Sequence, residues 1–123
     1  MIFLDTSSLI RFFTEDKPKK ALLVKELLEE EEKVSISEVV FPELEYVLEK
    51  TYKTKREKIV EAFKFLASRP NIKLSRSVKK AIGFFEETKL DMADCLIAAH
   101  SLKGKLASFD KKLLSMEGVI EYW

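Results

Sequence analysis

Two aspartates follow short apolar runs of the kind that form buried strands. Asp5 comes directly after Ile2-Phe3-Leu4, and Asp110 ends the segment Leu106-Ala107-Ser108-Phe109-Asp110. In open parallel sheets, ligands bind beyond the carboxyl ends of the strands, at the point where the strand order reverses. If these two strands are neighbours in one sheet, Asp5 and Asp110 point into the same crevice.

Three further acids lie on predicted helices. Asp91 and Asp94 are three residues apart at the start of an apolar helix, and this spacing places them on roughly the same side. Glu43 borders the apolar stripe of another helix, whereas Glu45 and Glu49 are expected to point further from it. An acid at the rim of a buried face needs a partner or a metal ion.

Several carboxylates in one pocket repel one another unless some are protonated or a cation binds them. Oxygen ligands favour hard cations such as Mg²⁺ or Mn²⁺. Such an ion can activate water, orient a phosphate and stabilise the leaving oxygen. From the sequence we expect no His–Cys or His–Ser pair that competes for the role of nucleophile and base.

Each of these acids also has a purely structural interpretation. Asp5 and Asp110 could cap the helices that follow them, and Asp91 is expected to be a helix N-cap whatever else it does. Asp94 could complete a capping arrangement from the third helical position, and Glu43 could be a solvated helix residue. The joint placement of the five acids favours the metal site over this set of separate explanations.

Apolar runs and turn residues predict alternating strands and helices. We expect strands at residues 2–4, 34–36, 72–74, 105–107 and 119–120. We expect helices from Thr6 through Phe13, from Pro18 with Asp16 as cap, from Ser37 as cap through Leu48, from a capping box at residues 54–57 through Leu66, and over residues 77–87, 91–102 and 111–116. This alternation indicates a parallel sheet with helices on both faces.

Composition limits the possible classes of protein. The 123 residues form one predicted domain, and a net charge of +1 excludes a simple polycation that coats nucleic acid. Cys95 is the only cysteine, which excludes a disulfide framework and a thiolate metal site. We find no signal peptide and no apolar run long enough to span a membrane, so we expect a cytoplasmic protein.

Four segments of the chain resemble the PIN-domain family, in particular its VapC-type toxin ribonucleases. Residues 2–9 match an apolar strand followed by Asp-Thr, and residues 37–48 place Glu43 at the family's acidic position. Residues 91–99 are similar to the family's Asp-Ala-Leu-Ile-Ala-Ala run, and residues 106–111 to its Thr-Phe-Asp segment. Cys95 stands where Ala is usual and Ser108 where Thr is frequent, and neither departure removes an acid.

The resemblance implies a three-layer α/β/α sandwich whose mainly parallel, five-stranded sheet has the strand order 3-2-1-4-5. It implies that Asp5, Glu43, Asp94 and Asp110 bind Mg²⁺ or Mn²⁺, with Asp91 as an auxiliary ligand. It also implies that Ser7 and Ser108 hydrogen-bond a ligand carboxylate or a metal-bound water.

The function that follows is a metal-dependent endoribonuclease that hydrolyses RNA through a metal-activated water, with single-stranded RNA as the expected substrate. By resemblance it is a homodimer and the toxin of a toxin–antitoxin pair, with an antitoxin that fills the acidic pocket with a basic side chain. The alternative is a PIN-fold module that binds RNA or protein without cutting. A phosphatase-like hydrolase with Asp5 as nucleophile is disfavoured because Ser7 stands where its second aspartate belongs.

Other residues allow two interpretations each. The basic stretches 50–56 and 76–80 could contact RNA or form solvated helix junctions, and Arg11, Lys111 and Lys112 could touch phosphates. His100 is expected to be a packed or surface residue, and Cys95 a core residue. The following aromatics are expected in the core or at a dimer face: Phe12, Phe13, Phe63, Phe65, Phe84 and Phe85.

Overall fold

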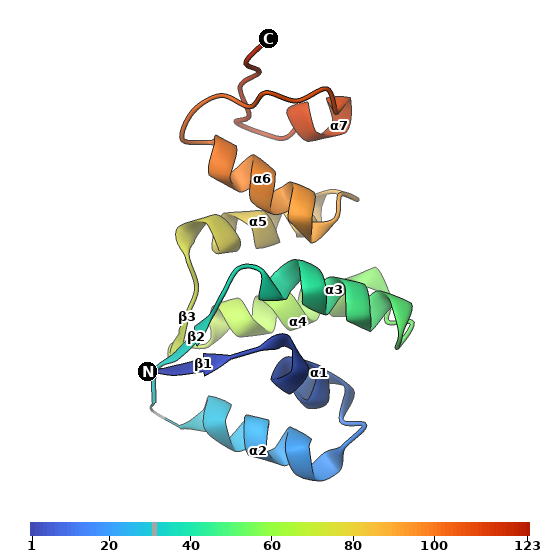
Figure 1. The fold of residues 1–123 in the computed structure, drawn as a ribbon, viewed down its shortest axis with the longest axis vertical. Coiled ribbons are helices and arrows are strands. Elements are labelled where there is room, and N and C mark those ends of the chain that lie inside the picture. The colour runs from blue at the N-terminus through green and yellow to red at the C-terminus, as the bar shows by residue number, and fades with distance from the viewer. Residues whose placement is uncertain (31) are drawn as a thin grey trace. The chain divides into compact units, whose positions relative to one another are not determined.

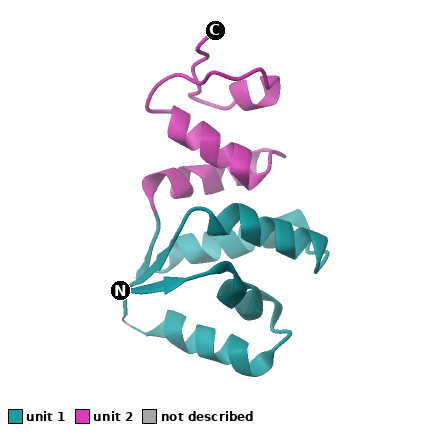
Figure 2. Ribbon diagram, viewed as in Figure 1, with its two compact units in different colours: residues 1–74 teal, residues 75–123 magenta. Residues whose placement is uncertain are grey.

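The computed structural model describes residues 1–30 and 32–123 of the chain. Up to residue 73 its strands and helices follow one another in the predicted order, and the elements described after that are helices (Figure 1). The chain divides into two compact units, residues 1–74 and residues 75–123 (Figure 2), and each is considered by itself below.

Unit 1 contains a parallel sheet of three short strands. The strands are β1 (Ile2–Leu4), β2 (Val34–Ile36) and β3 (Ile72–Lys73), in the spatial order β1-β2-β3. Leu4 pairs with Ile36, and Val34 pairs with Ile72. Parallel neighbours need a crossover between them, which helices supply here. The predicted mixed α/β class, the parallel sheet and the 3-2-1 part of the strand order are therefore confirmed.

Four helices connect these strands. They are α1 (Thr6–Thr14), α2 (Pro18–Glu29), α3 (Val40–Lys50) and α4 (Arg56–Ser68). Helix α1 packs against α2 and against α3, and α3 contacts α4. The rings of Phe41 and Phe63 are fully buried and meet edge to face at 5.3 Å, so they join α3 to α4 in the core. Phe12, Phe13 and Phe65 are only half-buried and form a cluster of their own.

Three predicted helix caps in unit 1 are wrong. Helix α2 does begin at Pro18, but its N-cap is Lys17, because the Asp16 carboxylate is bound by Arg11 and Tyr52 instead. Helix α3 begins at Val40, after a turn in which the Ser37 carbonyl accepts the Val40 N–H. Helix α4 begins at Arg56 without a side-chain cap, so residues 54–57 do not form a capping box.

Unit 2 is built on two packed helices, α5 (Arg76–Glu87) and α6 (Met92–Ser101), followed by the short α7 (Lys111–Leu114). Phe85, Met92 and Cys95 are completely buried, as the apolar character of this region predicts. The side chain of Ser75 caps α5 by accepting the Val78 N–H.

The predicted fourth and fifth strands are not strands in the structure. Leu106 and Glu121 form one isolated parallel bridge in unit 2, with hydrogen bonds from Leu106 N to Ile120 O at 2.7 Å and from Tyr122 N to Leu106 O at 2.9 Å. A central parallel strand needs both of its faces covered by other elements. Lys105 and Ala107 are exposed here, so one face of this segment is left uncovered. The five-stranded sheet is therefore wrong for the described residues, and the three-layer sandwich stays a prediction.

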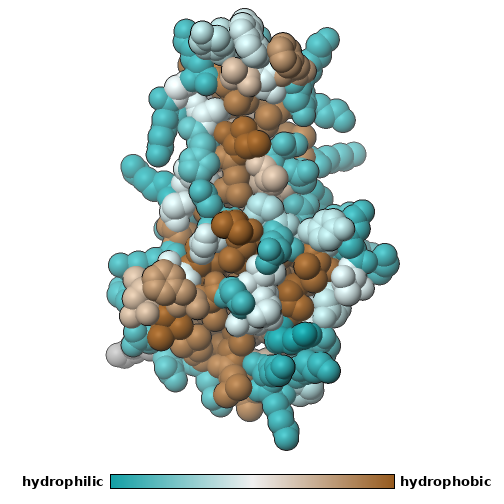
Figure 3. Space-filling view, in the orientation of Figure 1, coloured by the Kyte–Doolittle hydropathy of each residue, from teal (hydrophilic) through white to brown (hydrophobic). Residues whose placement is uncertain are grey.

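Apolar side chains remain at the surface of both units on the face drawn in Figure 3. Large exposed apolar residues come from β1, α2, α6 and the segment after α7. Within residues 1–30 and 32–123, no helix is both long enough and apolar enough to cross a membrane.

Candidate metal centre

Asp5 is an ionised, positioned carboxylate at the end of β1. Its Oδ1 caps α1 by accepting the Ser8 N–H at 3.0 Å. The Ser7 hydroxyl donates to Oδ1 at 2.8 Å and lies 3.0 Å from Oδ2, so the expected bond from Ser7 to a site carboxylate is present. The backbone bond from Ser8, followed by the bond from Ser7, holds the pKa of Asp5 below its usual range. The carboxylate is exposed and has lone pairs left for a further ligand.

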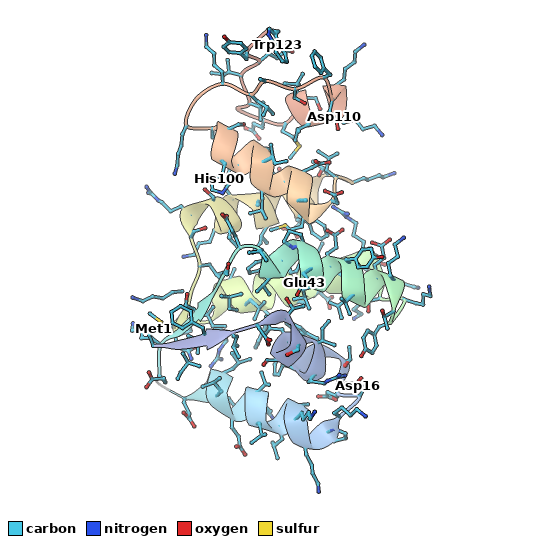
Figure 4. The ribbon with its side chains drawn as sticks, in the orientation of Figure 1. Met1, Asp16, Glu43, His100, Asp110 and Trp123 are labelled. Carbon is cyan, nitrogen blue, oxygen red and sulfur yellow. The ribbon has the colours of Figure 1, made fainter. Side chains whose placement is uncertain are left out.

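Glu43 lies in the first turn of α3, where its side chain is exposed (Figure 4). The partial positive charge at a helix N-terminus favours a carboxylate there. The buried acid of this helix is Glu45, at 7% exposure, so the prediction that Glu45 points away from the apolar stripe is wrong. The buried face is wide enough to include Glu45, because it also takes in Val40, Phe41 and Leu44.

Asp91 and Asp94 lie together at the start of α6. Asp91 is the N-cap, as predicted, and its Oδ1 accepts the Asp94 N–H at 2.9 Å. Partial burial raises the pKa of the Asp94 carboxyl, and the negative charges of Asp91 and Asp110 raise it further. The charges of Asp91 and Asp110 therefore act on Asp94 in the same direction as its burial, and a bound cation would oppose both effects.

Asp110 caps α7 by accepting the N–H groups of Lys112 at 3.0 Å and Leu113 at 3.2 Å. The Ser108 hydroxyl accepts the backbone N–H of Asp110 at 3.0 Å, so it orders the turn before α7 rather than holding the carboxylate. The capping interpretation of Asp110 is therefore correct. A role for Ser108 toward a metal-bound ligand stays a prediction.

The candidate acids divide between the two units. Asp5 and Glu43 belong to unit 1, where α1 packs against α3, and the other three acids belong to unit 2. Among the residues that the structure describes, no group of three or more His, Cys, Asp or Glu side chains is arranged to hold a metal ion. The donor chemistry nevertheless fits a hard divalent cation, because every candidate is a carboxylate and offers oxygen ligands.

Ser77 and His100 form a serine–histidine contact in unit 2. The Ser77 Oγ lies 3.4 Å from the His100 Nδ1 and links α5 to α6. Ser77 is only 8% exposed, so its hydroxyl cannot reach a phosphodiester bond without disrupting the packing of α5. We therefore interpret this pair as a contact between helices, and the carboxylates remain the candidate site.

Arg11, Asp16 and Tyr52 form a polar cluster in unit 1. The Arg11 guanidinium is 2.6 Å from the Asp16 carboxylate, and the Tyr52 hydroxyl donates to the same carboxylate at 2.8 Å. The bonds from Tyr52 and Arg11 lower the pKa of Asp16 to about 2. Because its charge is already paired, Arg11 is a poor candidate for a phosphate contact. A hollow of about 510 Å³ that includes Tyr52 contains none of the five candidate acids.

Three exposed aromatics beside Asp110 were missed by the sequence reasoning. Phe109, Tyr122 and Trp123 form an aromatic cluster at the surface of unit 2. The signal that could have found Phe109 is a large aromatic directly before a candidate metal ligand, set between Ser108 and the charged run of residues 110–112.

Comparison with known proteins gives one match, to a protein family. A family model described as PIN domain matches residues 2–119, a span that includes all five acids as well as Ser7 and Ser108. No curated protein and no solved structure matches the chain. Since the family model covers nearly the full sequence and carries a nuclease-type fold, the chain belongs to the PIN-domain family.

Proposed function

We propose that this PIN domain is a metal-dependent endoribonuclease that hydrolyses phosphodiester bonds of single-stranded RNA. PIN domains are generally metal-dependent nucleases, so membership of the family supports a hydrolase. The proposed ligands of Mg²⁺ or Mn²⁺ are Asp5, Glu43, Asp94 and Asp110, with Asp91 as an auxiliary ligand. The observation that carries the proposal is the grouping of acids in unit 2, where Asp91 and Asp94 begin α6 and the charges of Asp91 and Asp110 add to burial in raising the pKa of Asp94.

The chain's own groups prepare these ligands for a cation. Ser7 and Ser8 hold Asp5 ionised and fix its orientation at the end of β1. Asp91 and Asp110 are held by the helix N–H groups that they cap, so their side chains are ordered before any ligand arrives. Ordered ligands lose less conformational freedom on binding. A bound divalent cation supplies charge that stabilises the phosphate and lowers the pKa of an attacking water.

The likeness to VapC-type toxins extends the proposal to products and partners. It adds 5′-phosphate and 3′-hydroxyl ends, a homodimer, and an antitoxin that inserts a basic side chain among the acids. The net charge of the chain is only +1, which is too small to attract a polyanion by itself. Any affinity for RNA therefore depends on local groups.

The test is cleavage of a mixed-sequence single-stranded RNA with Mg²⁺, with Mn²⁺ and with EDTA. We expect cutting only with a metal and its loss in the variant Asp5→Asn, Asp94→Asn. Glu87→Gln is the matched control, because it removes one exposed carboxylate of α5 that is not a candidate ligand. Mn²⁺ binding measured by calorimetry gives a readout that does not depend on activity.

Full ribonuclease activity in the double variant would exclude the proposed mechanism. Metal binding without cutting, or tight RNA binding that ignores EDTA, would instead favour the PIN-fold binding module. End-group analysis of the products with a phosphatase and a 5′-kinase separates a 5′-phosphate from a 5′-hydroxyl.

A further inference from the structure

The aromatic cluster of unit 2 consists of Phe109, Tyr122 and Trp123, and its rings lie at the surface. Phe109 is 89% exposed and Trp123 is 67% exposed. Their rings are stacked, with centroids 4.7 Å apart and planes 9° from parallel, and Tyr122 meets Trp123 edge to face at 5.7 Å. A phenylalanine stabilises a fold mainly by being buried, and the exposed Phe109 forgoes nearly all of that contribution. Its position therefore needs an explanation other than stability of the core.

The backbone on both sides of the stack is anchored. Next to Phe109, the Asp110 N–H is held by Ser108, and the Asp110 side chain caps α7 with two hydrogen bonds. Next to Trp123, the Tyr122 N–H donates to the Leu106 carbonyl. The two rings are thus presented by fixed chain segments, and a ligand that stacks on them pays little ordering entropy.

Exposed charged residues follow Phe109 directly along the chain. Asp110 precedes Lys111 and Lys112 along the chain, and all three side chains are exposed. A stable protein interface of standard size needs about 800 Å² from each partner, far more than two stacked rings provide. An exposed flat ring followed in the chain by two exposed lysines suits one nucleobase and its phosphate, because every base has a π-face and every phosphate is anionic.

The stack is continuous with the proposed metal site. Phe109 directly precedes Asp110, and adjacent Cα atoms are about 3.8 Å apart. We propose that Phe109 and Trp123 form a stacking platform that holds one base of the single-stranded RNA substrate next to Asp110. The proposal rests on the proposed ribonuclease function for the identity of the ligand. The outer face of Phe109 takes the base, while Trp123 supports the ring from behind.

Trp123 is the only tryptophan, so its fluorescence reports the stack without a label. We would titrate the full chain with a short single-stranded RNA in EDTA, where the proposed cleavage cannot occur. We expect saturable quenching, and binding that is roughly 5- to 150-fold weaker in Phe109→Ala, the range for loss of one stacked base. Phe109→Leu should weaken binding like Phe109→Ala, whereas Phe109→Tyr should restore it.

Ile97→Ala is the control, because it truncates an exposed apolar side chain of α6 outside the cluster. Wild-type RNA affinity in Phe109→Ala, with an unchanged circular dichroism spectrum, would overturn the platform. The platform would also be overturned if wild type sediments as a dimer and Phe109→Ala as a monomer while RNA affinity is unchanged. The rings would then bind a second copy of the chain rather than RNA.

The two proposals fail separately. Quenching by RNA that depends on Phe109, in a protein that never cuts, supports the platform and removes the nuclease. Metal-dependent cutting with the same KM and the same quenching in wild type and Phe109→Ala supports the nuclease and removes the platform.

Discussion

Replacing Asp5 separates its role as the N-cap of α1 from its proposed role as a metal ligand. Asp5→Ala removes the acceptor of the Ser8 N–H, and loss of such a cap costs about 1 kcal/mol of unfolding free energy, with a range of roughly 0.5–2 kcal/mol. Asp5→Ser keeps a side-chain oxygen at the cap, and serine ranks with aspartate at this position. Serine nevertheless lacks the anionic oxygen that a divalent cation needs.

Urea denaturation followed by circular dichroism measures the first role, and RNA cleavage measures the second. We expect Asp5→Ala to lose about 1 kcal/mol and Asp5→Ser to stay within a few tenths of a kcal/mol of wild type. We expect both variants to lose cleavage. Equal destabilisation of the two variants would refute the capping argument, and full cleavage by Asp5→Ser would refute the ligand argument.

The stability difference between wild type and Asp5→Ala should depend on pH with a definite sign. The pKa of Asp5 is lowered in the folded chain, chiefly by the Ser8 N–H and then by the Ser7 hydroxyl. The stabilisation from its ionised form is therefore fully present above the unfolded pKa of about 3.9 and is lost as the pH falls through the lower folded value. A difference that grows on acidification would contradict this assignment.

Three further predictions concern other parts of the chain. Burial, and then the charges of Asp91 and Asp110, raise the pKa of Asp94, so the ionisation of this carboxyl opposes folding above its unfolded pKa. Mn²⁺ should therefore raise the melting temperature of the wild type at pH 7 and raise it less near pH 4. Mn²⁺ should not raise the melting temperature of Asp94→Asn. Gly118 has a φ of 85°, and an added Cβ would lie 3.1 Å from Leu102 Cδ2. Gly118→Ala should therefore lower the free energy of unfolding, measured by chemical denaturation, by about 1 kcal/mol or more. Gly104→Ala should not lower it, because the added Cβ meets open space. Phe41→Ala should cost about 3–5 kcal/mol because Phe41 is fully buried against Phe63, whereas the exposed Phe109→Ala should leave the denaturation midpoint nearly unchanged.

Local features of the sequence predicted much of the fold correctly. Short apolar runs placed β1 and β2, and Pro18 marked the start of α2. Asp91 and Asp110 were recognised as possible caps because capping depends on residues within one turn. The order of the four family segments also indicated the PIN domain, which the family match over residues 2–119 confirms.

Features that depend on distant partners were not predictable in this way. Asp16 looks like a cap for α2, yet its carboxylate is bound by Tyr52, a residue 36 positions further along the chain. Glu45 looks solvent-facing, yet the width of the buried face of α3 encloses it. Ser77 and His100 meet only because α5 packs on α6.

The sequence by itself therefore determined the alternation of strands and helices over residues 2–73 and the capping geometry of Asp5, Asp91 and Asp110 at helix starts. Hydrogen bonds within a few residues and the period of apolar side chains set these features, and both are readable from neighbours. Only the tertiary structure decided that a single bridge between Leu106 and Glu121 replaces the strands predicted at residues 105–107 and 119–120. It also decided that Phe109 stacks on Trp123 at the surface. Both outcomes depend on which side chains another segment covers, and coverage is a property of the packed chain rather than of any window in the sequence.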